Sequence, residues 1–495
     1  MWWIAAGLAL DPFELWRVFD PEFPGADARS ATGALVIGEP VGVPRRRESV
    51  PAVDGVAVEA IEVMAVAPWH DLGFRGEGVK VAVFDLQWFG AGVDGATLGP
   101  FASHDCYTQR SCDLPINFLN PRFSFEEGRH GLGCAEIIRS VAPDAELHLV
   151  RVNSETALEN AVDWAIREGI DVVSVSLSFF NTSFYDGTGP ITAQAERFAA
   201  SGGVMAVSSG NYADQHWMGN FVDGDGDDVL DAEAGGPWLH LDEDQRGGAY
   251  ITWDQFHTCG RTDLDVVVTD EDGNIVARAE ERQPTEDRCA PVERVTIPAT
   301  PEGGWRRIAI VRHRGPTSGL RVNVLATAGQ IYRPHRDGSM ADPASASGVL
   351  TVGAVRADGY LSNGPEPFSS RGPTSDGRMK PEVAGPDGVS TLAYGPAGFF
   401  GTSAAAPAVA GALAVVMSSD PGLSPTDAAE HVKGWGIAET ASAWDLDPDF
   451  GFGKVHLPDP ERVDAPSGCG HQRMWMGALF AVPLVWRRRR SRTNA

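Results

Sequence analysis

The sequence lacks both long apolar runs and low-complexity tracts. No uninterrupted apolar run reaches the roughly 18 residues that a strong transmembrane helix needs. No compositional period is present either, and 43% hydrophobic with 22% charged residues is typical of a folded chain, not of a disordered, collagenous or coiled-coil one. The length of 495 residues allows two or three domains with ample core.

Basic residues are scarce. The chain has 40 Lys and Arg against 67 Asp and Glu, which gives a formal net charge of −27. This charge repels nucleic-acid backbones, and the densest basic run, Arg487 to Arg490, lies at the extreme C-terminus. We therefore expect no nucleic-acid partner.

Cysteine is also scarce, since six residues are few for a disulfide-held scaffold and their spacing fits none of the usual zinc sites. Cys106 and Cys112 flank a short polar loop, and Cys259 and Cys289 flank an expected hairpin pair. We expect two local disulfides, which favour an oxidising compartment. Cys134 lies in an apolar helical stretch, so we expect a small buried hydrophobe there and not a nucleophile.

Apolar strand-like runs alternate with helical periodicity in the first half of the chain. A buried strand is predicted at 79–84, ending on Asp85, and further strands at 146–152, 170–177 and 204–208. This alternation predicts an α/β fold with a doubly wound parallel sheet. Such a sheet presents its chemistry at the carboxyl ends of the strands.

The alternation breaks between about residues 214 and 330, where short alternating runs and the turn signal Asp272-Gly273 predict strands. We expect an inserted β-sandwich there. The chain then divides into a leader or loosely structured arm at 1–70, an α/β domain at 71–213 and 331–460, the insert at 214–330, and a linker with an apolar-basic tail at 461–495.

Three short segments of the chain each supply one group that catalysis could use: a nucleophile, a base and an acid. Ser403 lies in a glycine-flanked turn at the start of an expected helix, whose positive end favours a developing oxyanion. His130 opens another helix and Asp85 ends the first core strand, so the chain order is Asp, His, Ser. Taken singly, such a serine is more often a helix cap and such an aspartate a turn residue.

Seven segments in the same order resemble the subtilisin-like serine peptidases. They are Val81-Ala-Val-Phe-Asp85, His130-Gly131 with Val141-Ala-Pro-Asp-Ala145, Val173-Ser-Val-Ser-Leu177, Ser208-Ser-Gly-Asn211, Phe368-Ser-Ser-Arg-Gly-Pro373, Lys380-Pro381 and Gly401-Thr-Ser-Ala-Ala-Ala-Pro407. The resemblance covers about residues 69–416 apart from the insert.

The resemblance implies Ser403 as nucleophile, His130 as general base and then acid, and Asp85 as the group that fixes the imidazole tautomer. It implies Asn211 as an oxyanion donor, and a substrate-pairing strand made of Ser176, Leu177 and Ser178. The substrate would be a protein or peptide, and the chemistry requires no cofactor.

The sequence departs from the family pattern near the expected catalytic residues. Leu86-Gln87 follows Asp85 where Thr-Gly is usual, and the segment from His130 reads His-Gly-Leu-Gly-Cys-Ala-Glu136. Ser178 replaces a glycine that normally helps to open the first specificity pocket. We expect altered packing beside His130 and an altered substrate preference.

Asp223, Asp225 and Asp227 belong to the densest acidic cluster. Oxygen ligands at alternate positions with glycines between them suit calcium, although the glycine position is wrong for an EF-hand loop. A calcium site and a solvated acidic turn remain equally supported interpretations.

Two apolar segments lie at the chain ends. Met1 to Leu10 lacks the basic region and cleavage site of an export signal, so it is either an atypical signal or part of the arm. Met474 to Trp486 would span only about 20 Å as a helix and precedes four arginines. With Ser467-Gly-Cys-Gly470 before it, this layout resembles the cysteine-bearing sorting tails of bacterial surface proteins. The alternative is a disordered basic tail.

These observations predict an exported serine endopeptidase outside the bacterial cytoplasm, with transient membrane contact through the tail. A second hypothesis is a catalytically idle surface protein in which the insert binds a polymer or partner. An esterase or lipase is excluded because Ser403 lacks the Gly-x-Ser-x-Gly turn and the chain order differs.

Overall fold

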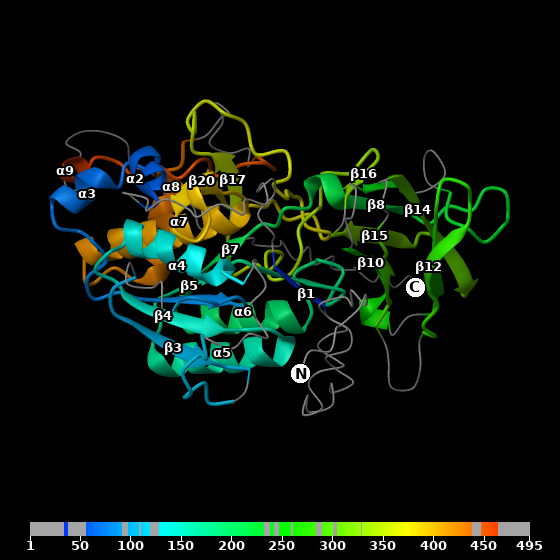
Figure 1. Ribbon diagram of the computed structural model, residues 1–495, viewed down its shortest axis with the longest axis horizontal. Helices are drawn as coiled ribbons and strands as arrows, with labels where there is room; N and C mark the ends of the chain where they lie inside the picture. Colours follow the sequence, from blue (N-terminus) through cyan, green and yellow to red (C-terminus); the bar gives the residue numbers. More distant parts are fainter. Residues whose placement is uncertain are drawn as a thin grey trace, which may run out of the picture.

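The computed structural model describes residues 34–37, 56–91, 98–107, 110–118, 128–231, 238–241, 247–258, 261–283, 290–299, 304–327, 329–437 and 447–463. Two lobes lie side by side, an α/β domain and an all-β insert (Figure 1). The expected Cys259–Cys289 pair and the C-terminal tail lie outside the described residues.

The α/β domain is built on a seven-stranded parallel sheet in the order β18-β17-β7-β5-β2-β4-β3. This is the doubly wound sheet that the sequence predicts. Its strands are β2 (Lys80–Asp85), β3 (Phe101–Asp105), β4 (Glu146–Arg151), β5 (Val172–Val175), β7 (Val204–Ser208), β17 (Leu350–Arg356) and β18 (Val383–Asp387).

Both faces of the sheet are buried, which explains why its strands read as continuous apolar runs. Along β2, Val81 and Val83 join the core under α4 and α7, whereas Ala82 and Phe84 join the core under α5 and α6. Figure 1 shows the two helix pairs on opposite sides of the sheet. The helices are α2 (Val58–Val63), α3 (Ala67–Asp71), α4 (His130–Val141), α5 (Glu155–Glu168), α6 (Pro190–Ala200), α7 (Thr402–Ser419), α8 (Pro425–Gly434) and α9 (Pro460–Val463).

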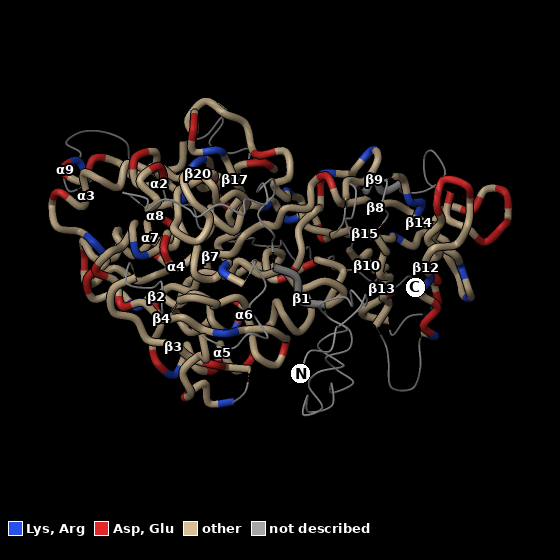
Figure 2. Tube along the Cα trace, in the orientation of Figure 1, with Lys and Arg blue, Asp and Glu red and all other residues tan. Residues whose placement is uncertain are grey.

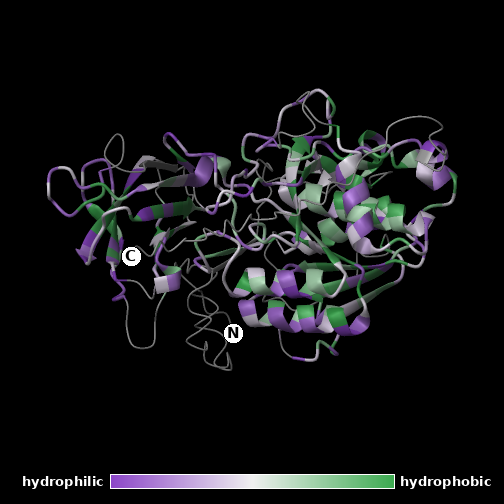
Figure 3. Cartoon of the chain, turned by 180° about the vertical axis from the view of Figure 1, so that it is seen from behind, coloured by the Kyte–Doolittle hydropathy of each residue, from purple (hydrophilic) through white to green (hydrophobic). Residues whose placement is uncertain are grey.

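Helix α5 shows how local sequence sets the boundaries of a helix. The Ser154 side chain accepts a hydrogen bond from the Ala157 backbone N–H and caps the first turn. Gly169 ends the helix with φ of 63°, in the left-handed region that glycine adopts at little cost. Purple and green alternate along α5 and α6 in Figure 3, as expected for helices with one apolar and one polar face.

Helix α7 is the one helix among the described residues that is long and apolar enough to span a membrane, and 89% of it is buried inside the protein. It serves as a core helix of the α/β domain. It contacts β5, β7, β17 and β18 as well as α4 and α8.

One predicted strand is shorter than expected. The run at 170–177 forms β5 only as far as Val175, and after Ser176 the chain continues as a separate strand, β6 (Leu177–Phe180). Strand β6 is not part of the seven-stranded sheet. It pairs instead with β1 (Ala34–Ile37) in antiparallel register.

The insert contains two antiparallel sheets with one shared core. The four-stranded sheet holds β8 (His216–Asn220), β10 (Gly247–Trp253), β13 (Val292–Ile297) and β15 (Arg321–Ala326). The five-stranded sheet holds β9 (Trp238–Leu241), β11 (Asp263–Thr269), β12 (Ile275–Ala279), β14 (Gly304–Arg314) and β16 (Gln330–Ile331). Short 3-10 turns lie at η3 (Ala213–Gln215) and η4 (Phe256–Thr258).

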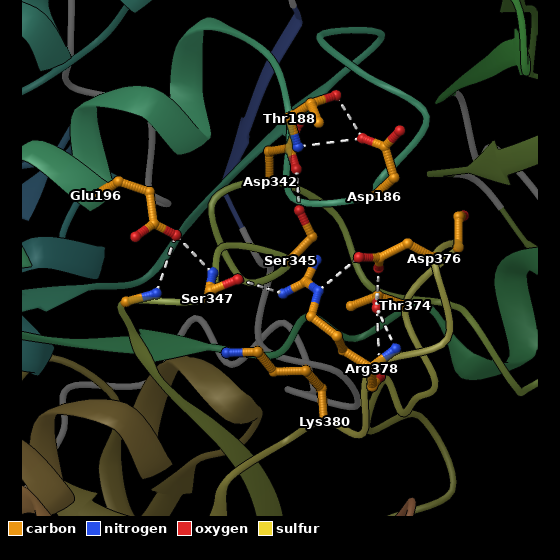
Figure 4. Close-up of polar contacts among 12 residues, drawn as sticks. Asp186, Thr188, Glu196, Asp342, Ser345, Ser347, Thr374, Asp376, Arg378 and Lys380 are labelled. Carbon is orange, nitrogen blue, oxygen red and sulfur yellow. Dashed lines mark hydrogen bonds and ion pairs between the residues drawn. The ribbon is translucent and has the colours of Figure 1, made fainter. Parts of the chain in front are cut away.

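Where the chain returns from the insert, it passes alongside β6. Asp342 accepts the Phe179 backbone N–H through its carbonyl at 2.8 Å, while its buried carboxyl accepts hydrogen bonds from Thr182, Ser183 and Ser345. Burial raises the pKa of Asp342 to about 6. Figure 4 shows Asp342 beside Ser345 in a wider polar network. In that network Glu196 accepts the Ser347 N–H, and Arg378 pairs with Asp376. This network fixes where the insert re-enters the α/β domain.

A disulfide joins Cys106 and Cys112, in agreement with the expected local pairing. Cys134 is free and buried, also as expected.

Candidate active site

Asp85 ends β2 at the carboxyl edge of the sheet and is fully buried. Its Oδ1 accepts the backbone N–H groups of Leu86 at 2.7 Å and Gln87 at 3.0 Å. Because both contacts are made by backbone atoms, the unusual side chains at 86 and 87 leave them intact. The second oxygen, Oδ2, remains available for a side-chain partner.

That partner is His130, the first residue of α4. Its Nδ1 lies 2.6 Å from Asp85 Oδ2, and the ring is buried. A carboxylate that already accepts two amides favours Nδ1–H, so Nε2 carries the lone pair. Nε2 has no hydrogen-bond partner among the described residues. Gly131 permits this approach, because a Cβ there would lie 2.8 Å from the Asp85 Cβ.

Ser403 is the second residue of α7 and is fully buried. Pro407 lies four residues further on, in the second turn of the helix. Since proline has no N–H, the Ser403 carbonyl loses its helical donor. The Ser176 hydroxyl at 3.1 Å and the Cys134 thiol at 3.4 Å donate to it instead.

Cys134 connects the parts of the site. Its sulfur, an Asp85 oxygen and a His130 nitrogen lie within 4.8 Å of one another, and the same thiol contacts the Ser403 carbonyl. Burial, and then the Asp85 charge, raise the pKa of the Cys134 thiol well above its ordinary value, so the thiol stays neutral. The structure thus brings the Ser403 backbone next to the Asp85–His130 pair.

Asn211 follows β7 at the same edge of the sheet and is buried. Its Oδ1 accepts both the backbone N–H and the hydroxyl of Thr402 at 3.0 Å. The amide nitrogen then faces Gly401, where an added Cβ would lie 2.9 Å from Nδ2. Asn211 is therefore held against the segment that carries Ser403.

Ser176, Leu177 and Ser178 lie beside this site and are all buried. Ser176 contacts the Ser403 carbonyl, as described above. Leu177 and Ser178 begin β6 and pair with Ile37 and Val36 of β1. An extended segment therefore already lies along the strand that the resemblance assigns to substrate.

A β-hairpin not predicted from the sequence lies against His130. Its strands are β19 (Val389–Thr391) and β20 (Gly395–Phe399). The Phe399 ring packs edge-on against His130, with centroids 5.7 Å apart, and Tyr394 stacks on Phe399. Glu136 of α4 accepts the backbone N–H groups of Leu392 and Ala393. Glu136 was visible only as a departure from the family pattern; the role of its carboxylate depends on tertiary contacts.

The acidic cluster lies far from this site, in the insert, where Figure 2 shows red loops at the end remote from the seven-stranded sheet. Oxygens of Asp223, Asp225 and Asp227 lie within 4.8 Å of one another. Asp223 accepts the Gly226 N–H at 2.8 Å and Asp227 accepts the Val229 N–H at 2.8 Å. The loop is therefore compatible with a bound cation and also with a solvated turn.

Residues 303–454 match the model of the subtilase family (Peptidase_S8). This range contains Ser403 but neither Asp85 nor His130. The minor extracellular protease Vpr of Bacillus subtilis (strain 168) is 27% identical over 395 residues, which cover 71% of this chain and 47% of that protein. The chain thus spans about half the length of this curated relative.

Among solved structures, the CspB protease of Clostridium perfringens superposes with a TM-score of 0.54 at 15% identity, covering 81% of this chain and 96% of that one. At this identity the likeness concerns the fold. The chain thus has a subtilisin-like α/β fold, and its residues 303–454 match the subtilase family.

Proposed function

We propose that the protein is a serine endopeptidase that works through an acyl-enzyme intermediate. Ser403 Oγ attacks the peptide carbonyl, His130 Nε2 takes its proton and later protonates the leaving amine, and Asp85 stabilises the imidazolium. Asn211 Nδ2 and the Ser403 backbone N–H stabilise the oxyanion. The observation that carries this proposal is the 2.6 Å contact between Asp85 and His130, joined to the Ser403 segment through Cys134.

The alternative is an idle surface protein on the same scaffold. An idle scaffold has no need of a buried, amide-anchored carboxylate paired with a histidine, since burying such polar groups is costly. The arrangement of Asp85 and His130 therefore favours the peptidase. With either function, the insert could in addition bind a polymer or a partner.

We expect Ser403 to be the one serine that a fluorophosphonate probe labels. Labelling should be lost in Ser403→Ala and retained in Ser183→Ala, a buried serine that contacts Asp342 and not the Asp85–His130 pair. Intact-mass measurement reads out one adduct per chain. Equal labelling of wild type and Ser403→Ala contradicts the proposal and supports the idle scaffold.

We expect Asn211→Ala to lower kcat by about 100-fold to 1,000-fold, the range for removing one oxyanion-hole donor, for which subtilisin is the reference case. KM should change little, because the contact forms mainly in the transition state. Steady-state kinetics on a chromogenic peptide measures both. An effect confined to KM would place Asn211 outside the oxyanion hole.

We propose that substrates bind as an added strand on β6, and that β1 competes with them. The support is the antiparallel β1–β6 register from Ala34↔Phe180 to Ile37↔Leu177. Such pairing uses main-chain hydrogen bonds, so it accepts many sequences.

Weakening β1 should therefore raise activity. We expect Val36→Pro, which removes a main-chain donor from the strand, to lower the KM for a peptide substrate and leave kcat nearly unchanged. Val36→Thr, which keeps the donor and the β-branched shape, is the matched control. An unchanged KM in Val36→Pro would show that β1 does not compete with substrate.

We further propose that the protein acts outside the bacterial cytoplasm. The Cys106–Cys112 disulfide supports an oxidising compartment, and the similar protein of Bacillus subtilis is described as extracellular. The apolar segment from Met474 to Trp486 would then contact the membrane transiently before removal, with the arginines that follow it on the cytoplasmic side.

Calcium binding at the acidic loop of the insert is a separate proposal. Bunched carboxylates repel one another unless they are solvated or neutralised, so a bound cation should raise the thermal midpoint of the insert. We expect millimolar Ca²⁺ to raise this midpoint in wild type and not in Asp225→Asn, as measured by calorimetry. An unchanged midpoint after addition of Ca²⁺ or chelator favours the solvated turn.

A further inference from the structure

The carboxyl group of Asp387 is buried close to the nucleophile and has no part in the mechanism proposed above. Asp387 is the last residue of β18, and its side chain is fully buried. Its Oδ2 accepts the backbone N–H of Gly401 at 2.9 Å. Its Oδ1 has no hydrogen-bond partner among the described residues. Gly401 lies two positions before Ser403.

The bond from Gly401 to Asp387 closes the base of the β19–β20 hairpin. The hairpin leaves the sheet just after Asp387 and returns at Gly401. It carries Phe399 against the His130 ring. A displacement of the backbone at the base of the hairpin would therefore move both the ring that packs on the imidazole and the start of α7.

Two side chains hold consecutive amides at this point of the chain. Asp387 accepts the N–H of Gly401, and Asn211 accepts the N–H of Thr402. Gly401 has φ of 107°, a conformation that other residues rarely adopt, and Asn211 leaves no room for a Cβ there. The backbone leading into Ser403 is therefore fixed from two sides.

We propose that Asp387 is a positioning residue, which aligns Ser403 by holding the Gly401 amide. It touches neither substrate nor reacting atoms. The effect of Asp387 on turnover rests on the proposed peptidase function. Its effect on the Gly401 amide does not depend on that function. Preorganisation of this kind matters because small misplacements of a nucleophile cost large factors in rate.

The burial of Asp387 also changes its ionisation. Burial raises its pKa to about 7, against the opposing effect of the Gly401 hydrogen bond, while Glu366 raises the pKa further and Arg356 lowers it. Arg356 and Glu366 pair with each other at 3.0 Å. Helix α7 and strands β19 and β20, which pack around the carboxyl, carry no charged side chain. Helix α2, which contacts β18 and β19, carries Glu59 and Glu62, and Glu59 accepts the backbone N–H and the hydroxyl of Ser390.

Because the pKa of Asp387 is raised in the folded state, its ionisation makes the free energy of unfolding depend on pH. The folded protein holds the proton up to a higher pH than the unfolded chain, so this group reduces stability as pH rises from about 4 to about 7. Asp387→Asn keeps an acceptor for Gly401 and removes the ionisation. The thermal midpoint of Asp387→Asn, relative to that of the wild type, should therefore increase as pH rises across this range. A pH-independent gap between the two proteins would show that the carboxyl is not buried against Gly401 in the folded protein, and would count against the proposal.

The test compares Asp387→Ala and Asp387→Asn with wild type in the full chain. Hydrogen–deuterium exchange of a peptide covering residues 400–403 should be at least about tenfold faster in Asp387→Ala and near the wild-type rate in Asp387→Asn. In parallel, kcat should fall at least about tenfold in Asp387→Ala with KM nearly unchanged, and recover to within about threefold in Asp387→Asn.

Asp263→Ala is the matched control. Asp263 is equally buried and accepts one backbone N–H, from Gln283 at 3.1 Å, but it lies in the insert. Its loss should lower the thermal midpoint and leave kcat and exchange at 400–403 unchanged. Unchanged exchange in Asp387→Ala, or failure of Asp387→Asn to restore it, overturns the proposal. Turnover that does not depend on Ser403 would instead overturn the peptidase function, and the exchange comparison would still decide the role of Asp387.

Discussion

Burial of helix α7 is the constraint on which the α/β domain depends. Its residues are apolar around the whole helix, and all of them from Thr402 to Met417 are buried. Such a helix has no face for water, so it must be covered on every side. The central strands cover one side, and α4 and α8 cover others. Because α7 begins at the carboxyl edge of the sheet, the same packing that buries it delivers Ser403 to the strand ends that carry Asp85 and Asn211.

A proline inside this buried helix would ordinarily leave a carbonyl without a donor. Pro407 removes the donor of the Ser403 carbonyl, and an unpartnered buried carbonyl is costly. Ser176 and Cys134 supply the missing donors from two other elements. The missing helical donor in α7 therefore links the Ser403 segment to the strand end after β5 and to the helix that begins with His130. Cys134, which the sequence predicts to be only a small buried hydrophobe, thus contributes to the alignment of the site.

The sequence predicts the local parts of this structure and misses those set by distant contacts. Strands β2, β4, β5 and β7, and the placement of Asp85 and Asn211 at the carboxyl edge of their sheet, follow from apolar runs and from the geometry of parallel sheets. The β1–β6 pairing joins segments about 140 residues apart, and backbone pairing leaves no local signal. Glu136 could be seen as unusual but not interpreted, because the amides that it accepts belong to a hairpin whose position only the fold determines.

The insert has a closer relation to the candidate site than its position in the sequence suggests. It leaves the α/β domain just after Asn211 and returns at Asp342, whose carbonyl binds the Phe179 N–H of β6. Between these points Tyr250 of β10 packs on Phe180, and Phe180 packs on Tyr212, the neighbour of Asn211. One edge of β6 thus faces β1 and the other faces the return of the insert. If a substrate strand adds to β6 as proposed, it lies on a support to which both lobes contribute, and changes in the insert core would then alter substrate binding without contacting Asp85, His130 or Ser403.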